Sequence, residues 1–403
     1  MTDSQTSRAL RASADVVILG AGPAGLVLGN LLLAAGTDCV ILERASPSRV
    51  RTRARAGFLA PNTVRILDGH GLADGLHRYG HPHAACEFRT QDGRFRLDYG
   101  ALGQGGRHHV YPQQDLVTDL LRHYLGRGGR IRFRTEVLAV HDTDGTRPSV
   151  TARGPDGRTV RWTARYVAGC DGRRGAARRS LPADAVHHHD HGVTWLGLLA
   201  QAPPSLDAVG YAVHDRGFAG HMARTPEVTR YYLQWQRGTA ADAWPEQRIW
   251  DELDIRMRAP EYGPLNRGAL LERGLFDLSC DVAEPLRHGS LFLAGDAASV
   301  LAPAAAKGAN LAVLEAEMLA EALVDALTRG DTGGLDTYSD RSLEHIWRAQ
   351  EFTGWMTRLL HAPPDGDPGA GSFFQAARRR SRIASLRTSR SHQDWFADNY
   401  VGV

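Results

Sequence analysis

A glycine-rich turn near the amino terminus has the residue types and spacing of a phosphate-binding loop. The segment GAGPAG (residues 20–25) follows the apolar run DVVILG and precedes the leucine-rich run LVLGNLLLAAG. Gly20 permits a tight bend, Gly22 lets the backbone approach a pyrophosphate, and Gly25 allows a helix to pack closely on a strand. The next apolar run, DCVILER, reaches Glu43, a carboxylate suited to accept hydrogen bonds from ribose hydroxyls. The pattern predicts a dinucleotide-binding unit but does not distinguish NAD from FAD as the ligand.

Two later segments repeat the pattern of a strand that ends in a small polar turn. They are RYVAGCDGRRGAARRSL at 165–181 and GSLFLAGDAASV at 289–300. The second leads through Pro303 into NLAVLEAEMLAEALVDAL, whose apolar residues recur at the three- and four-residue spacing of an amphipathic helix. A plain NAD dehydrogenase, which would be colourless, has no need for this second dinucleotide contact. An extended FAD does need it, because its ribityl chain and flavin ring lie beyond the ADP half.

These motifs, in this order, resemble those of the 4-hydroxybenzoate 3-monooxygenase family, which are single-component FAD-dependent aromatic hydroxylases. The resemblance covers almost the whole chain from about Asp15, and includes RARAG at 53–57, VTWLGLLAQAPP at 193–204, residues 216–235, EFTGWMTRLLH at 351–361 and DNYVG at 398–402. It implies that NAD(P)H reduces FAD and that oxygen then forms a flavin hydroperoxide. This species hydroxylates a substrate phenolate at the 3-position, beside the phenol oxygen. A ligand-sensing flavoprotein is the non-enzymatic alternative.

The resemblance assigns the phenol end of the substrate to a proton relay. Tyr211 would touch the phenol oxygen, Tyr400 would lie behind it, and His83 would be the exit, with the carbonyl of Pro303 also close to the phenol oxygen. A phenol with a pKa near ~10 is about 0.1% ionised at neutral pH, and lowering that pKa by two to three units takes about 3–4 kcal/mol. A tyrosine relay can stabilise the phenolate and pass the proton outward.

At the carboxylate end, the resemblance assigns Arg224 to grip the substrate, with Tyr232 assisting. Met222 departs from the family, which has a serine there, and Ala304 and Ala305 replace a Thr-Gly pair beside Pro303. The lost serine hydrogen bond weakens binding of 4-hydroxybenzoate or signals a modified substrate. The changed size near the ring leaves room for a substituent, so 3-amino-4-hydroxybenzoate is the alternative substrate.

The resemblance also places FAD against residues from all three motifs. The expected contacts are Gly20, Gly22, Ala24, Gly25, Glu43, Arg44, Arg53, Arg55, Gln113, Asp171, Asp296, Gly308, Ala309 and Asn310. Asp296 would bind the ribityl chain, and the last three would offer backbone or side-chain hydrogen bonds near the pyrimidine edge of the flavin. Lys307 is interpreted either as an electrostatic aid to reduced flavin or as a solvated charge.

Four arginines are the expected contacts for NAD(P)H. They are Arg44, Arg49, Arg174 and Arg178, where Arg174 replaces a family histidine and Ser279 replaces a family arginine. NADPH is favoured over NADH because Arg44 and Arg49 can meet a 2′-phosphate.

The charge and composition of the chain exclude several other classes of protein. The formal charge is only +3 over 403 residues, so no nucleic-acid partner is expected. No apolar run has the length of a membrane span, and Met1–Ala14 lacks an apolar signal core, so a cytoplasmic protein without membrane contact is expected.

The run HHHDH at 187–191 is interpreted as a flexible loop rather than a metal site, and RRRSR at 378–382 as a solvated or subunit-facing helix surface. The family resemblance implies a homodimer.

The expected fold class is α/β. A Rossmann-like FAD domain would be interrupted by a mostly β substrate domain and followed by a helical carboxy-terminal region. The predicted segments are FAD domain at 1–80, a substrate-domain excursion at 81–105, FAD domain again at 106–185, substrate domain at 186–290, the GD motif and flavin loop at 291–310, and the helical region at 311–403.

Overall fold

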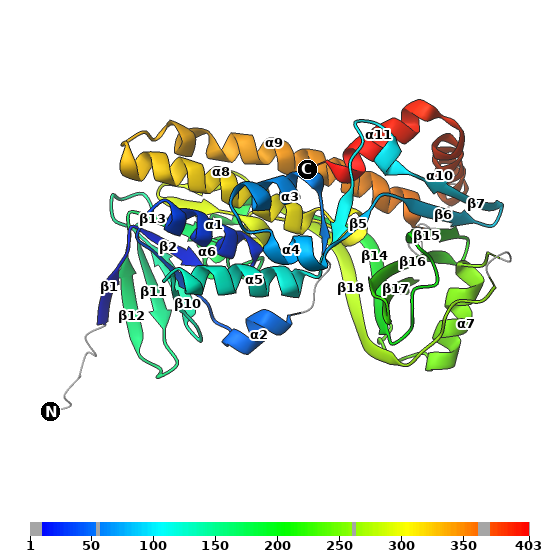
Figure 1. Cartoon of the computed structure of the whole chain (residues 1–403), viewed down its shortest axis with the longest axis horizontal. Coiled ribbons are helices and arrows are strands. Elements are labelled where there is room, and N and C mark those ends of the chain that lie inside the picture. The colour runs from blue at the N-terminus through cyan, green and yellow to red at the C-terminus, as the bar shows by residue number, and fades with distance from the viewer. Residues whose placement is uncertain (1–9, 54–56, 260–262, 362–370, 403) are drawn as a thin grey trace.

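The computed structural model describes residues 10–53, 57–259, 263–361 and 371–402, and it has two lobes along its long axis (Figure 1). One lobe contains a six-stranded sheet and the other an eight-stranded sheet. The long helices α8 (Gly308–Thr328) and α9 (Gly333–Leu360) run beside each other along one side of the molecule. This mixed arrangement confirms the predicted α/β class.

The six-stranded sheet is the core of the first lobe. Its order is β19 (Arg287–His288), β20 (Leu291–Leu293), β13 (Tyr166–Gly169), β2 (Val16–Leu19), β3 (Cys39–Leu42) and β9 (Arg130–Arg132). All pairs are parallel except the edge pair of β19 with β20. Every residue of β2 and β3 is buried, as their unbroken apolar sequences predict for parallel strands covered on both faces.

A second, smaller sheet and several helices complete this lobe. The sheet order is β1 (Leu10–Ser13), β12 (Thr159–Thr163), β11 (Ser149–Arg153) and β10 (Glu136–His141). The helices are α1 (Pro23–Ala34), α2 (Pro47–Thr52), α3 (Pro61–Gly69), α4 (Asp74–Tyr79), α5 (Gln113–Gly126) and α6 (Ala176–Arg179). Helix α1, which follows the glycine turn, packs against both α5 and α8.

The eight-stranded sheet forms the second lobe. Its order is β21 (Ser299–Val300), β18 (Leu270–Ala283), β14 (Val186–Ala200), β17 (Val228–Trp235), β16 (Gly217–Thr225), β15 (Val209–His214), β6 (Cys86–Thr90) and β7 (Gly93–Leu97). Helix α7 (Glu246–Arg256) packs beside β15 and β16. Long strands β14 and β18 connect the two lobes (Figure 1).

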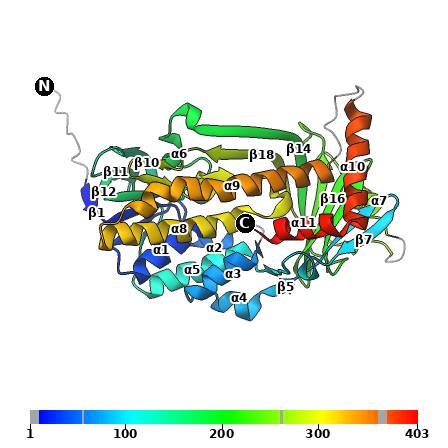
Figure 2. The same cartoon turned by 90° about the horizontal axis from the view of Figure 1, so that it is seen from above.

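Where the lobes meet, a small sheet and the last helices close the structure. The sheet order is β4 (Phe58–Leu59), β8 (His108–Val110) and β5 (His81–His83). Figure 2 shows α9 meeting α10 (Gly371–Thr388) and α11 (Arg390–Val401) at the second lobe. Helix α11 thereby returns the end of the chain to the middle of the molecule.

The HHHDH and RRRSR runs both fall within these helices and strands. The HHHDH run is not a loop: His187–Asp190 pair with Val282–Ser279 of β18 within strand β14, so that prediction is wrong. The RRRSR run lies in helix α10 as expected, although Arg379 is buried. Within the described ranges, no helix is long and apolar enough to cross a membrane, and no group of side chains has the composition of a metal site. The six-segment domain division stays a prediction.

Candidate active site

The glycine turn between β2 and α1 has the backbone geometry that a pyrophosphate requires. Gly20 has φ +96°, and an added Cβ would lie 2.5 Å from the carbonyl oxygen of Cys170. A Cβ on Gly25 would lie 2.1 Å from the carbonyl oxygen of Gly20, so this position needs close backbone approach. A Cβ on Gly22 would meet no protein atom within 4 Å. The space in front of α1 is therefore open, as a phosphate at a helix amino terminus requires.

Two carboxylates flank this turn. Glu43 accepts hydrogen bonds from the backbone N–H groups of Ala21 and Ala45, both at 2.7 Å. Asp171, in the CDG turn after β13, accepts from Ala177 N–H at 3.2 Å through Oδ2, while its buried Oδ1 has no partner among the described residues. Burial raises the pKa of Asp171 to about 6, and the backbone hydrogen bonds oppose this shift. An unpaired buried oxygen beside the cradle fits a ligand that donates a hydrogen bond.

The GD motif follows β20 in a left-handed turn. Gly295 has φ +64°, and its N–H donates to the carboxylate of Glu315 at 2.6 Å. Glu315 is buried in α8, and burial raises its pKa to about 8. This contact holds the turn that presents half-buried Asp296. Sequence reasoning missed Glu315 because, in an amphipathic helix, it reads as an exposed charge.

The loop after Pro303 ends at the amino terminus of α8. Ala306 has the left-handed φ of 53°, and the first helical backbone bond runs from Leu311 N–H to Lys307. The N–H groups of Gly308, Ala309 and Asn310 therefore precede the helical hydrogen-bond ladder and form a site for a partial negative charge.

The side chain of Asn310 is committed elsewhere. Its Oδ1 accepts from Ala60 N–H and Thr63 Oγ1, both at 2.8 Å, and its Nδ2 donates to the carbonyl oxygens of Phe58 at 3.0 Å and Ala306 at 2.8 Å. All of its hydrogen-bonding capacity is thus used within the protein. Of the two predicted kinds of contact with the flavin, only the backbone N–H of Asn310 is available in this conformation.

The remaining predicted FAD contacts are spread around the cradle. Ala24 is buried in α1, half-buried Gln113 begins α5, and the side chains of Arg44 and Arg53 are exposed. Arg55 lies outside the described residues. The open helix terminus, the unpaired Asp171 oxygen and the amino terminus of α8 together fit an extended FAD.

The predicted phenol end is assembled from distant parts of the chain. Tyr211 on β15 and Tyr400 on α11 are both buried, and their hydroxyl oxygens are 2.7 Å apart. Burial raises the pKa of both phenols, so both keep their protons at neutral pH. Ala304 belongs to the same apolar cluster, whereas Pro303 next to it is exposed. The cluster brings the predicted relay and the flavin loop together.

His83, the predicted exit, is half-buried at the end of β5. Its Nδ1 is 2.7 Å from the hydroxyl of Tyr99, and its Nε2 accepts from Val209 N–H at 3.2 Å. Burial lowers its pKa to about 4, and Arg96 adds to the shift, so the imidazole is neutral at neutral pH. Both ring nitrogens therefore have protein partners, which sequence reasoning did not foresee.

The predicted carboxylate end lies on β16 and β17. Arg224 and Tyr232 share a side-chain hydrogen bond, which opposes the lowering of the Arg224 pKa by burial. Tyr232 and half-buried Met222 pack against the cluster that contains Tyr211. The predicted phenol-end and carboxylate-end residues thus border one apolar cluster.

Sequence reasoning missed two further residues beside this cluster, Gly220 and Trp195. Gly220 pairs with Tyr211 on one side and Tyr232 on the other. A Cβ there would lie 2.8 Å from the Phe218 ring and 3.4 Å from Tyr232, so glycine allows these two rings to approach the strand closely. The ring centroids of Trp195 and Tyr232 are 4.8 Å apart. A glycine within a strand, where side chains are the rule, was the available signal.

Lys307 is not a solvated charge, and that alternative is wrong. Its side chain is 2% exposed, and its Nζ donates to the carbonyl oxygen of Tyr400 at 2.9 Å and to that of Gly402. Burial lowers its pKa to about 7. Because these carbonyls end helix α11, the Lys307 side chain joins the flavin loop to the helix that carries Tyr400.

The arginines predicted for NAD(P)H lie on two segments. Arg44 and Arg49 are exposed around the start of α2, and Arg174 is exposed in the turn before α6. Arg178 is buried, and its guanidinium is 3.3 Å from the carboxylate of Asp281. A charge already paired in this way is less suited to meet a phosphate than the exposed arginines.

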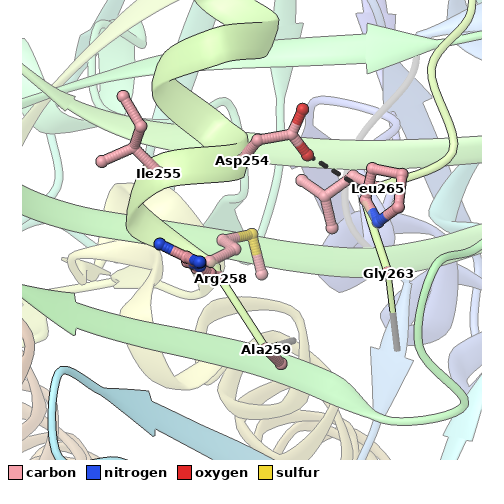
Figure 3. A pocket seen from close by; sticks show the side chains of 8 residues that line it. Asp254, Ile255, Arg258, Ala259, Gly263 and Leu265 are labelled. Atoms are coloured by element: carbon pink, nitrogen blue, oxygen red, sulfur yellow. Dashed lines mark hydrogen bonds between the residues drawn. The ribbon is translucent and has the colours of Figure 1, made fainter. Parts of the chain in front are cut away.

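One surface hollow lies away from all predicted site residues. It is found at the end of α7, where Leu265 N–H donates to Asp254 at 2.9 Å, and Ile255 and Arg258 also line it (Figure 3). The residues that could bind FAD and an aromatic acid lie elsewhere, at the junction of the lobes.

Comparison with known proteins agrees with this geometry. The FAD binding domain family matches residues 13–353. The p-hydroxybenzoate hydroxylase of Acinetobacter baylyi is 35% identical, over 96% of this chain and 95% of that protein. The 3-amino-4-hydroxybenzoate 2-monooxygenase PtnB3 of Streptomyces platensis is 30% identical, over 94% of each. The crystal structure of p-nitrophenol 4-monooxygenase PnpA from Pseudomonas putida has a TM-score of 0.77 at 22% identity, covering 98% of this chain and 99% of that one, which is a likeness of fold.

The chain belongs to the family of FAD-dependent aromatic hydroxylases. It is a flavin-dependent aromatic monooxygenase, and the resemblance to p-hydroxybenzoate hydroxylase predicted from its motifs is confirmed. The alternatives of a plain NAD dehydrogenase and a non-enzymatic flavoprotein do not fit this membership.

Proposed function

We propose that this enzyme uses NAD(P)H and oxygen to hydroxylate 4-hydroxybenzoate at the 3-position. The observation that carries the proposal is the pair of hydroxyl oxygens of Tyr211 and Tyr400, which lie 2.7 Å apart in an apolar cluster. Tyr232, the hydrogen-bond partner of Arg224, packs against the same cluster. A phenol bound at one end and a carboxylate bound at the other describe a para-substituted ligand. The flavin loop contributes Ala304 to that cluster.

The tyrosine pair activates the substrate by hydrogen bonding. Because both phenols keep their protons, Tyr211 donates to the substrate oxygen while Tyr400 donates to Tyr211. Such bonds strengthen when their acceptor is an anion, so they favour the phenolate over the phenol. The phenolate form makes the ring carbon beside its oxygen electron-rich.

The arginine fixes the other end of the ring. Arg224 meets the carboxylate in a bidentate manner and Tyr232 holds the guanidinium in place. Most of the surrounding cluster is apolar, which excludes water from the reacting ring and strengthens both polar contacts.

FAD, when bound, supplies reducing equivalents from NAD(P)H and the activation of oxygen. The open amino terminus of α1, the Gly295–Asp296 turn and the N–H groups of Gly308 and Ala309 would hold it. The exposed Arg44 and Arg49 support NADPH as the reductant, because they provide positive charge for a 2′-phosphate.

A coupled assay tests this proposal. Purified holoenzyme is supplied with oxygen, 4-hydroxybenzoate and either NADPH or NADH, and nicotinamide oxidation, peroxide and product are measured together. One 3,4-dihydroxybenzoate per NADPH oxidised is expected, with slower turnover on NADH. Peroxide equal to the NADPH oxidised, without product, would contradict the substrate assignment.

A ring-substituted substrate is the second candidate, and Met222 is the residue that favours it. Met222 has no hydrogen-bond donor to offer a carboxylate, and Ala304 is smaller than the threonine that the family has at that position. A relative named for 3-amino-4-hydroxybenzoate is 30% identical to this chain. Product from the amino compound alone in the same assay would establish this candidate.

A further inference from the structure

We propose that Tyr99 is a positioning residue of the proton path, and that it connects Tyr400 to His83. The inference rests on the proposed function, because a substrate phenol must supply the proton. Tyr99 begins the short turn η1 (Tyr99–Ala101) and is fully buried. It lies outside every motif that carried the family resemblance.

The hydroxyl of Tyr99 has partners that define where the protons lie. Its oxygen is 2.8 Å from the carbonyl oxygen of His83, 2.7 Å from Nδ1 of the same residue and 3.4 Å from Nδ1 of His108. A carbonyl only accepts, so the Tyr99 proton points to it and His83 Nδ1 carries a proton that it donates to Tyr99. His83 Nε2 accepts from Val209 N–H, which agrees with a neutral ring protonated on Nδ1.

On its other side, Tyr99 is in contact with the relay. The rings of Tyr99 and Tyr400 meet edge to face with centroids 5.0 Å apart, and His108 lies against both, at 5.5 Å and 5.3 Å. Phe58 stacks on His108 at 4.2 Å and keeps that ring in place. The side chains from Tyr211 to half-exposed His83 thus form a continuous group of polar rings.

Proton transfer along this group carries one proton from the substrate to solvent. The substrate phenol gives its proton to Tyr211 as Tyr211 gives its own to Tyr400, and Tyr400 passes its own through one bridging water to Tyr99. Tyr99 then gives its proton to Nδ1 of a His83 ring that carries its proton on Nε2 and faces solvent. His83 releases the Nε2 proton to water and is left protonated on Nδ1, while the substrate is left as phenolate.

The conformation in the structure is therefore the state after release. With its proton on Nδ1, the ring returns Nε2 to Val209 N–H and cannot accept another proton from Tyr99. Exchange with solvent resets it, and this requires the Val209 contact to break. Tyr99 thereby determines which tautomer of His83 is held and when the exit is open.

The variant Tyr99→Phe tests the connection because it removes the hydroxyl and keeps the ring contacts. Its control is Tyr231→Phe, which removes the hydroxyl of another buried tyrosine of the second lobe, 3.0 Å from Ser205. Oxidised holoenzyme is mixed with 4-hydroxybenzoate in a stopped-flow instrument, and phenolate absorbance is followed. We expect phenolate formation to slow by about tenfold or more in Tyr99→Phe, with the dissociation constant within about twofold of wild type. The control variant should match wild type.

A second measurement does not depend on the substrate. The ¹⁵N NMR spectrum of histidine-labelled enzyme, assigned with His83→Gln, should show His83 protonated on Nδ1, and Tyr99→Phe should weaken that preference. Wild-type His83 protonated on Nε2 would overturn the inference, and so would phenolate formation in Tyr99→Phe that is as fast as wild type or faster. If wild type forms no phenolate from 4-hydroxybenzoate or its 3-amino derivative, the proposed function fails and the inference falls with it. Normal phenolate formation in wild type, unchanged in Tyr99→Phe, overturns the inference alone.

Discussion

The hydroxyl oxygens of Tyr211 and Tyr400 lie 2.7 Å apart, although 189 positions separate the residues in the chain. Strand β15 supplies one and helix α11 the other. Lys307 donates to the carbonyl oxygen of Tyr400, so the loop before α8 also holds this helix in place. The proposed phenol end of the site therefore depends on helix α11 folding back against the second lobe.

Replacing Tyr400 with phenylalanine removes the hydrogen bond that Tyr211 receives. We expect the pKa of the bound substrate phenol to rise by about one unit, because Tyr211 becomes a weaker donor to the phenolate. Turnover should fall by about 100-fold. A spectral pH titration of bound 4-hydroxybenzoate measures the pKa, with Tyr166→Phe in the first lobe as control. An unchanged phenol pKa would show that the hydroxyl pair does not act on the substrate.

Replacing Arg224 with alanine should remove most of the selection for a carboxylate. The loss of about 3–5 kcal/mol raises the dissociation constant for 4-hydroxybenzoate by about 150- to 4000-fold. Flavin fluorescence on titration gives the constants. Binding of 4-methylphenol, which lacks the carboxylate, should change little, and Arg237→Ala, which removes an arginine paired with Asp190, is the control variant. Equal weakening for both ligands would assign Arg224 a general structural role.

The variant Met222→Ser should restore a hydrogen bond to the substrate carboxylate. A hydrogen bond to a charged group contributes about 1.5–3 kcal/mol, which is about a 10- to 100-fold tighter dissociation constant for 4-hydroxybenzoate. The control is Ala223→Ser, because adjacent residues of a strand face opposite sides of the sheet. Isothermal titration of both variants with the two candidate acids measures the change. Weaker binding of 4-hydroxybenzoate by Met222→Ser would argue for the amino compound as the natural substrate.

Two glycines of the first turn should respond differently to alanine. A Cβ on Gly22 meets no protein atom within 4 Å, so Gly22→Ala should change apoprotein stability by less than about 0.5 kcal/mol while weakening FAD binding. A Cβ on Gly25 meets Gly20, so Gly25→Ala should destabilise the apoprotein by about 1–3 kcal/mol or more. Urea unfolding of apoprotein and FAD titration separate the two effects. Normal FAD affinity in Gly22→Ala would contradict the position assigned to the pyrophosphate.

The pH dependence of stability tests the buried ammonium group of Lys307. Burial lowers its pKa from 10.5 to about 7, so between these values the unfolded chain binds the proton and the folded chain does not. Stability should therefore rise with pH across this interval, and the variant Lys307→Met should lack that part of the rise. Urea unfolding of both proteins at pH values of about 6.5, 8 and 9.5 checks this. Parallel stability curves would mean that the folded-state pKa of Lys307 is not lowered.

Local sequence patterns were sufficient to predict the glycine turn and the central strands of the first lobe. The turn at Gly20 to Gly25 and the apolar runs of β2 and β3 are contiguous in sequence, and their geometry follows from glycine conformation and strand burial. The Asp296 turn was predicted for the same reason. Contacts between distant segments were harder, because no local pattern marks the partners of Asn310, the burial of Lys307 or the pairing of Arg178 with Asp281.

The second lobe shows the same difference. The HHHDH run was interpreted as a flexible loop, yet these residues form part of strand β14, paired with β18, and their side chains are largely exposed. Tyr99 and His108 are unremarkable in sequence, and only the fold brings them beside Tyr400. Resemblance to a family could identify Tyr211, Tyr400 and His83, but it could not identify residues particular to this chain.

A single-turnover experiment tests the proposed hydroxylation of 4-hydroxybenzoate. Enzyme-bound FAD is reduced once in the absence of oxygen, 4-hydroxybenzoate is bound, and oxygen is then admitted. We expect close to one 3,4-dihydroxybenzoate to form for each bound FAD. Peroxide in that amount, with no hydroxylated product, would contradict the assignment of 4-hydroxybenzoate as the substrate.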